Sequence, residues 1–482
     1  MANIHGIYIS EEATAVVVPQ ESDAGLQVVI GTAPVNQLDD PSSAVNVPIL
    51  ANTATEAMAA LGYSTDFEAY TLCQTMYITS NMYQVAPVVY INVLDPSVHY
   101  KAMDEQTAAV SSLQATVDVE GILKDSVTVA NGSTTLTVDE DYTLSFDDDG
   151  YLVITLLSTG SAADATELTV NGNVLDPSAV DADDIIGAYD TDTGAETGLE
   201  VIRQVYPSLG VVPGILLAPG WSQDANVGIA LAAKAANING VFKAMAFIDL
   251  DTTEAIKYTD VKTVKEDSGF TSEYACVFWP CFEVGDYIFA ASAVAAARTA
   301  YLDSEHDDVP SQSPSNKDLS ITGTCLADGT TVVLDQDQGT TVGEYGVITA
   351  ININGYRLWG NHTAAYPSSS DAKDIWINVR RMFNWQGNTF ILTYFDKVDD
   401  PMNYKLIESI VDSENIRCAA YAPDHWAGAS IEYLEADNPI TSILAGEMTF
   451  RQHIAPYTPA ETINNILNYD TDMLQSALTG GE

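Results

Sequence analysis

The chain has 482 residues, which exceeds what one hydrophobic core usually supports, so we expect about two to four domains. It carries 18 Lys and Arg residues against 67 Asp and Glu residues, which gives a formal net charge of −49. A surface of this sign argues against binding to nucleic acid or to an anionic membrane, because like charges repel.

A short strand is predicted almost at the beginning of the chain, over the stretch HGIYIS at residues 5–10. Its alternation places Ile7 and Ile9 on one face and Tyr8 on the other. No adjacent segment can form a hairpin with it, and a lone strand of this length is not stable in water. We therefore expect this strand to join a sheet elsewhere.

An α/β layer is predicted next. Residues 26–34 and 86–94 are apolar runs typical of buried strands, and residues 53–61 and 67–82 between them have helical character. Alternation of helices with apolar strands is typical of a sheet covered by helices.

The pattern changes to a small antiparallel β module at about residues 115–180. Short alternating strands are separated by hairpin turn signals at Asn131-Gly132 and at residues 147–150. The acidic tract that follows, near residues 180–198, is interpreted as the exit linker.

The α/β pattern returns after Val201. Strands are predicted at residues 211–217, 243–251 and 274–282, with a helix capped by Ser222 and another over 286–302. Strand, helix and strand at this spacing indicate right-handed βαβ units in a largely parallel sheet. The β module is therefore inserted into an α/β body or attached to it.

The last third has a different organisation. Helices are predicted from Asp371 and from Asp400-Pro401, and a strand over FILTYFDKV at residues 390–398. Residues 446–459 then alternate, which predicts a strand with Gln452 and Ile454 on one face. The apolar residues of the following stretch, 461–470, sit at helical spacing.

The motifs of common catalytic and cofactor sites are absent. The sequence contains no P-loop, no GxGxxG and no GxSxG, and its six His residues never fall at HxxxH or HxH spacing. The five Cys residues form no CxxC pair, and with no secretory signal visible we interpret them as reduced thiols of a cytosolic product. We accordingly predict no catalytic residue, no cofactor and no metal.

Three segments in order resemble contractile phage tail sheath proteins. They are the opening HGIYISEEATAVVVPQESDAGLQVVIGTAPVN, the central SEYACVFWPCFEVGD with AARTAYLDSEHDDVPSQSPSNKDLSITG, and the late GYRLWGNHTA with AGEMTFRQHIAPYTPAETINNILNYD. The resemblance covers nearly the whole chain. It departs from the family at residues 461–470, where the family has a terminal strand.

The resemblance implies a multi-domain α/β fold. The body has a parallel sheet similar to that of subtilisin without its catalytic residues, with an inserted antiparallel β-sandwich, an α+β C-terminal domain and extended strand arms at both ends. The expected divisions are an N-terminal linking arm (1–25), the N-terminal part of the body (26–110), the β-sandwich insertion (111–185), the subtilisin-like domain (186–355), the C-terminal sheath domain (356–445) and a C-terminal linking arm (446–482).

The resemblance also implies a structural function. Copies stack as hexameric rings around an inner tube and contract to drive the tube through a target cell envelope. The expected partners are other copies of the chain, the inner tube protein, and baseplate and tail terminator proteins, with no nucleic acid contact and no membrane insertion. The expected location is the tail of a virion or phage-tail-like particle assembled in the host bacterial cytoplasm. Two alternatives remain: a static lattice or tube protein, and an α/β hydrolase-type enzyme.

Two groups of residues are predicted to mediate assembly. The abundance of exposed strand signals and the family arms predict exchange of strands between subunits, and a late basic helix predicts contact with an acidic inner tube. The strand-exchange residues are His5, Gly6, Ile7, Tyr8, Ile9, Ser10, Met448, Thr449, Phe450, Arg451, Gln452, His453 and Ile454, and the tube-contact residues are Lys373, Arg380 and Arg381.

Overall fold

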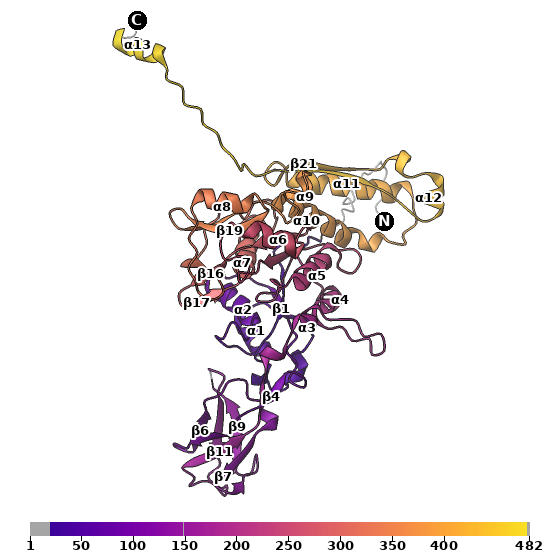
Figure 1. Ribbon diagram of the computed structural model, residues 1–482. Coiled ribbons are helices and arrows are strands. Elements are labelled where there is room, and N and C mark those ends of the chain that lie inside the picture. The colour runs from indigo at the N-terminus through magenta and orange to yellow at the C-terminus, as the bar shows by residue number, and fades with distance from the viewer. Residues whose placement is uncertain (1–19, 148, 480–482) are drawn as a thin grey trace, which may run out of the picture.

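The computed structural model describes residues 20–147 and 149–479, and the predicted strand at residues 5–10 lies outside them. The molecule is elongated, with three parts in line: a β module at one end, an α/β body in the middle and a C-terminal layer at the other end (Figure 1). Within the described residues, no helix has both the length and the apolar character required to cross a lipid bilayer.

One eight-stranded sheet organises the body. Its order is β2-β3-β1-β13-β14-β15-β19-β20; the six inner strands are parallel, and the edge strands β2 and β20 are antiparallel to their neighbours. The strands are β1 (Gln27–Gly31), β2 (Ile49–Ala51), β3 (Val88–Asn92), β13 (Ile215–Leu217), β14 (Met245–Asp249), β15 (Ala275–Phe278), β19 (Val347–Asn352) and β20 (Tyr356–Trp359). Strands β1 and β3 therefore share a sheet with strands that come more than a hundred residues later.

Helices cover this sheet, and strands β1, β3, β14 and β15 are buried at every residue, which is why these strands are nearly continuous apolar runs. The helices of the body are α1 (Ala54–Leu61), α2 (Leu72–Asn81), α3 (Ala182–Ile186), α4 (Ile202–Leu209), α5 (Ala225–Ala236), α6 (Val261–Ser268), α7 (Ala291–Ser304) and α8 (Gln336–Gly343). A three-stranded sheet of β16 (Cys281–Val284), β17 (Tyr287–Phe289) and β18 (Gly323–Cys325) lies beside them.

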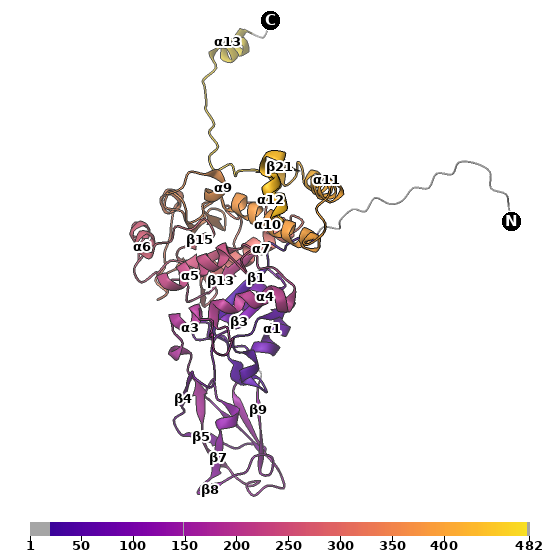
Figure 2. The same cartoon turned by 90° about the vertical axis from the view of Figure 1, so that its right-hand side faces the viewer.

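The predicted antiparallel module is present and has its own core. One sheet contains β5 (Gln106–Ala109), β7 (Thr128–Asn131), β8 (Thr134–Thr135) and β11 (Glu167–Asn171), and the other contains β6 (Gln114–Val117), β9 (Tyr142–Phe146) and β10 (Leu152–Leu156). Buried residues such as Val129, Ile154 and Leu168 form a cluster separate from that of the body. The short pair β4 (Tyr100–Ala102) and β12 (Asn173–Leu175) connects the module to the body (Figure 2).

The C-terminal layer packs helices under a two-stranded sheet. Its elements are α9 (Ala372–Ile375), α10 (Ile377–Tyr394), α11 (Tyr404–Ala420), β21 (Trp426–Glu432), α12 (Ile440–Leu444) and β22 (Arg451–Pro456). Met382, Trp385, Cys418 and Trp426 form its buried centre. Beyond β22 the chain projects away from the molecule and ends in α13 (Thr471–Thr479) (Figure 1).

Several predicted elements differ in the structure. Residues 390–394, predicted as a strand, continue helix α10, because a short apolar run does not distinguish a strand from a buried helix. Residues 461–470 form no helix; helix α13 begins only after Asp470, whose carboxylate accepts hydrogen bonds from the next helical N–H groups. Asp224, and not Ser222, caps helix α5. The acidic tract at 180–198, interpreted as a linker, contains the capped helix α3.

Candidate linking site in the C-terminal layer

The predicted late strand exists, and it pairs within its own chain. Strand β22 is antiparallel to β21, with Ser430 opposite His453 and Ile431 opposite Gln452. The strand begins at Arg451, so the predicted members Met448, Thr449 and Phe450 lie just before it. Its alternation is as predicted, since Gln452 and Ile454 are half-buried whereas Arg451 and His453 are exposed.

A buried polar network fastens β22 to the helices below it. Glu414 on α11 has no exposed surface, and its Oε1 accepts hydrogen bonds from Gln452 Nε2 at 2.8 Å, Arg417 Nη2 at 2.6 Å and Gln386 Nε2 at 2.6 Å. Burial by itself would raise the pKa of the Glu414 carboxyl, but the charge and hydrogen bonds of Arg417 and the two amides hold that pKa below its ordinary value. The predicted C-terminal arm at 446–482 is corrected by this finding, because its first part belongs to the folded layer.

The two edges of the β21–β22 sheet are not equivalent. Ile431 N–H donates to Asn415 Oδ1 at 2.9 Å, and Ile431 C=O accepts from Asn415 Nδ2 at 3.0 Å. Since these groups are occupied by Asn415, the Ile431–Gln452 pair is of the non-hydrogen-bonded type, and the backbone N–H and C=O of Gln452 face away from β21. Among the described residues no strand pairs with that outer edge of β22.

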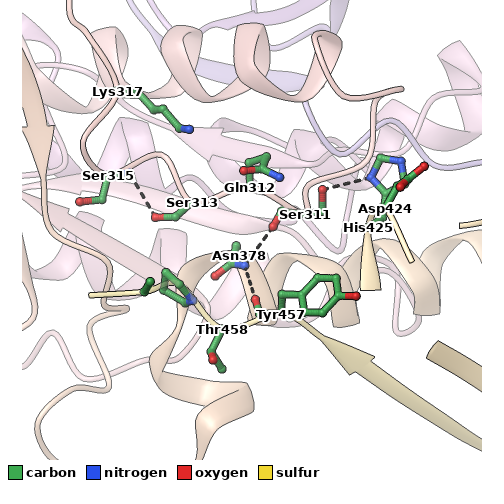
Figure 3. A pocket seen from close by; sticks show the side chains of 12 residues that line it. Ser311, Gln312, Ser313, Ser315, Lys317, Asn378, Asp424, His425, Tyr457 and Thr458 are labelled. Atoms are coloured by element: carbon green, nitrogen blue, oxygen red, sulfur yellow. Dashed lines mark hydrogen bonds between the residues drawn. The ribbon is translucent and has the colours of Figure 1, made fainter. Parts of the chain in front are cut away.

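The C-terminal extension leaves the layer at a fixed point directly after β22. Asn378 Nδ2 donates to Tyr457 C=O at 2.9 Å and to Ser311 C=O at 3.0 Å, which joins the extension to the body (Figure 3). A polar cavity of about 240 Å³ adjoins this point, and the Oδ1 of Asn378 has no hydrogen-bond partner among the described residues.

The C-terminal extension after β22 carries several exposed apolar side chains. Residues 457–470 adopt no regular secondary structure, and Ile463, Ile466 and Leu467 are each more than four-fifths exposed. Large apolar side chains that are exposed close together usually mark a surface for a partner.

The start of the described chain also lies on this layer. Gln20 N–H donates to Thr393 Oγ1 at 3.1 Å, and Ser22 N–H donates to Thr389 Oγ1 at 3.1 Å, so residues 20–22 pack against helix α10. Both terminal segments therefore depart from the same small layer.

The three predicted tube-contact residues do not form a basic surface. Arg381 is 2% exposed and makes an ion pair with Asp303, with Nη1 3.0 Å from Oδ1. Arg380 is 7% exposed and lies over the rings of Tyr274 and Phe383. The structure corrects the prediction for both arginines, because a buried guanidinium cannot contact another protein. Lys373 is at the surface, where its Nζ lies 2.9 Å from Asp371 and 2.7 Å from Asp374.

A second cavity, of about 550 Å³, is relevant to the alternative that the chain is an α/β hydrolase-type enzyme. It lies at the carboxyl ends of β13 and β14, and Asp249 at the end of β14 is buried beside it. Burial raises the pKa of Asp249, while hydrogen bonds from Ser292 and Ser222 to its carboxylate lower it less strongly. Among the described residues no histidine lines this cavity, and the two hydroxyls hold the start of α7 and the loop after β13 against Asp249.

In the part of the chain that the structure describes, no three His, Cys, Asp or Glu side chains are grouped so that they could hold a metal ion.

Four functional residues of this layer were not predicted from the sequence. Glu414 and Arg417 are three residues apart on a predicted helix, which is a signal for an ion pair but not for its burial. Asn415 and Asn378 carried no signal, because their partners, Ile431 and Tyr457, are distant in sequence.

The chain is similar to tail sheath proteins. No family model matches the sequence. The tail sheath protein of Burkholderia phage BcepMu is 26% identical over 496 aligned positions, which cover 98% of each chain. The tail sheath protein of Escherichia phage P2 is 26% identical over 285 positions, 58% of this chain and 68% of that protein. The fold resembles a chain of the contracted sheath complex of PVC, an extracellular contractile injection system, with a TM-score of 0.57 and 13% identity over 98% of this chain and 99% of that one.

Proposed function

We propose that the chain is a contractile tail sheath protein that stacks as hexameric rings around an inner tube and contracts to drive that tube through a target cell envelope. Its partners are then other copies of itself, the inner tube protein, and the baseplate and terminator proteins at the two ends of the tail. Its place is the tail of a virion or phage-tail-like particle assembled in the host cytoplasm. The role is structural and requires no cofactor.

The observation that carries this proposal is the similarity to a phage tail sheath protein along 98% of both chains. A similarity of that extent includes both terminal segments as well as the body. The alternatives fit less well: a static lattice protein has no reason to resemble a contracted sheath complex, and the similarity to a phage tail sheath protein along 98% of both chains does not favour an α/β hydrolase.

Strand exchange provides the connection between copies. Residues 5–10 of one copy add to the outer edge of β22 in a second copy, where the backbone of Gln452 and Ile454 is open. The exposed apolar row at 463–467 supports an equivalent role for the C-terminal extension. Lys373 stays a candidate for tube contact, with its charge shared by Asp371 and Asp374.

Contraction then requires no nucleotide. The extended lattice is metastable if the contracted lattice buries more surface between copies, since each square ångström of apolar burial contributes on the order of 25 cal/mol. Strand connections keep neighbouring copies attached while the bodies slide and rotate.

Removal of residues 1–19 tests the proposal. The truncated chain should remain a folded monomer with nearly unchanged melting temperature, because Gln20 and Ser22 still pack on α10, yet it should form no tubes by electron microscopy. The full chain, as control, should form tubes of contracted type. Ordered tubes from the truncated chain would contradict strand exchange, and flat sheets from the full chain would favour the static lattice.

A further inference from the structure

Only one edge of the β21–β22 sheet is built to receive a strand. We infer that Asn415 closes the edge of β21, so that a strand donated by a second copy of the chain joins β22 alone. This inference rests on the proposed strand exchange and specifies its side.

The side-chain amide of Asn415 occupies the β21 edge in the way a neighbouring strand would. It accepts from Ile431 N–H at 2.9 Å and donates to Ile431 C=O at 3.0 Å, the two bonds by which a paired strand residue would bind. An incoming strand would have to displace both bonds and leave a half-buried amide without partners, which costs free energy.

A bulge gives the β21 edge a second protection. The register shifts between Trp426 and Ala429, so β21 is irregular at the point where its edge is not covered by Asn415. Bulges at sheet edges twist the backbone and obstruct further pairing.

The β22 edge lacks both features. Its register with β21 is continuous from Arg451 to Ile454, and no described side chain bonds to the outward backbone groups of Gln452 or Ile454. The buried Glu414 carboxylate accepts a hydrogen bond from the Gln452 side chain, so β22 is anchored to α11 before any strand arrives. An edge that is already anchored lowers the ordering cost of binding.

Photo-crosslinking distinguishes the edges. The probe is a synthetic peptide of residues 1–20 with p-benzoylphenylalanine in place of Tyr8, added to the monomeric full chain, and mass spectrometry locates the crosslinked residues. We expect crosslinks within 451–456 and none within 426–432. Crosslinks concentrated on 426–432 would overturn the inference while leaving strand exchange intact, whereas absence of peptide binding would overturn the proposed strand exchange itself.

The variant Asn415→Ala tests the role of the side chain. In a folded variant, crosslinks to residues 429–432 should appear in addition to those on β22, and the number of peptides bound per chain in calorimetry should rise. Asp412→Ala, an exposed change on the same helix, should behave as the parent chain. If folded Asn415→Ala keeps its crosslinks on β22 only, Asn415 is not what closes the edge. If Asn415→Ala does not fold, the crosslink map of the parent chain still decides the side.

Discussion

At the residue scale, several of the few bases of this acidic chain are buried inside the protein. Arg381 shows this most clearly, because its guanidinium joins helix α10 to Asp303 on α7 and to the carbonyl of Ala24 at 2.8 Å. Loss of one partner of a buried ion pair usually costs about 3–5 kcal/mol, since the other charge stays buried without compensation.

Charge reversal at Arg381 should therefore reduce stability and not tube affinity. We expect Arg381→Glu to lower the free energy of unfolding by at least about 3 kcal/mol, measured by chemical denaturation. Lys373→Glu is the matched control at the surface of the same region and should leave stability nearly unchanged. Equal stability of the two variants would contradict the buried role of Arg381.

The carboxylate of Glu414 should make the stability of the C-terminal layer depend on pH. Its pKa is lower in the folded chain than in the unfolded chain, so its contribution to stability is present above the ordinary glutamate pKa and is lost as pH falls through the lowered value. Glu414→Gln should destabilise the protein at pH 7 by about 3–5 kcal/mol, because Arg417 then stays buried without a counter-charge.

Thermal melting between pH 3 and pH 7 measures both effects. The parent chain should lose stability toward acid, and the difference between parent and Glu414→Gln should shrink as pH falls. The double variant Glu414→Gln with Arg417→Met removes both charges and should recover part of the loss. A difference that does not depend on pH would indicate that packing, and not charge, is the contribution of Glu414.

At the element scale, the β module behaves as an independent unit. Its buried cluster is separate from that of the body, and the pair β4–β12 and a few side-chain contacts, such as that of Asn36 Nδ2 with Ile122 C=O, connect the two. We expect replacement of residues 103–172 by a short Gly/Ser linker to leave a soluble chain that still forms tubes, checked by gel filtration and electron microscopy. Insolubility of this deletion would show that the module contributes to the core of the body.

At the scale of the whole molecule, the net charge of −49 opposes assembly. Copies of one sign repel over the Debye length, which shrinks from about 30 Å at 0.01 M salt to about 8 Å at 0.15 M. The protein concentration at which tubes appear should therefore fall as NaCl is raised across this range, as measured by sedimentation. A concentration that rises with salt would mean that attractive charge pairs between copies dominate.

What the sequence determined by itself was local. The apolar runs at β1, β3 and β14 are bounded by Gly, Pro or Asp, and the hairpin signal at Asn131-Gly132 lies in a module of alternating strands. These patterns were sufficient to predict the α/β body and the inserted β module.

The tertiary structure decided what each segment contacts. Strand β21 was not predicted, because Gly428 and the bulge interrupt its alternation, and it is the partner of β22. Residues 390–394 are helical because α10 continues through them, with Thr393 and Tyr394 buried in the layer. The burial of Arg380, Arg381 and Glu414 likewise depends on neighbours tens to hundreds of residues away. Periodicity is a property of neighbouring residues and can be predicted from them, whereas burial and edge pairing arise only when distant segments pack together.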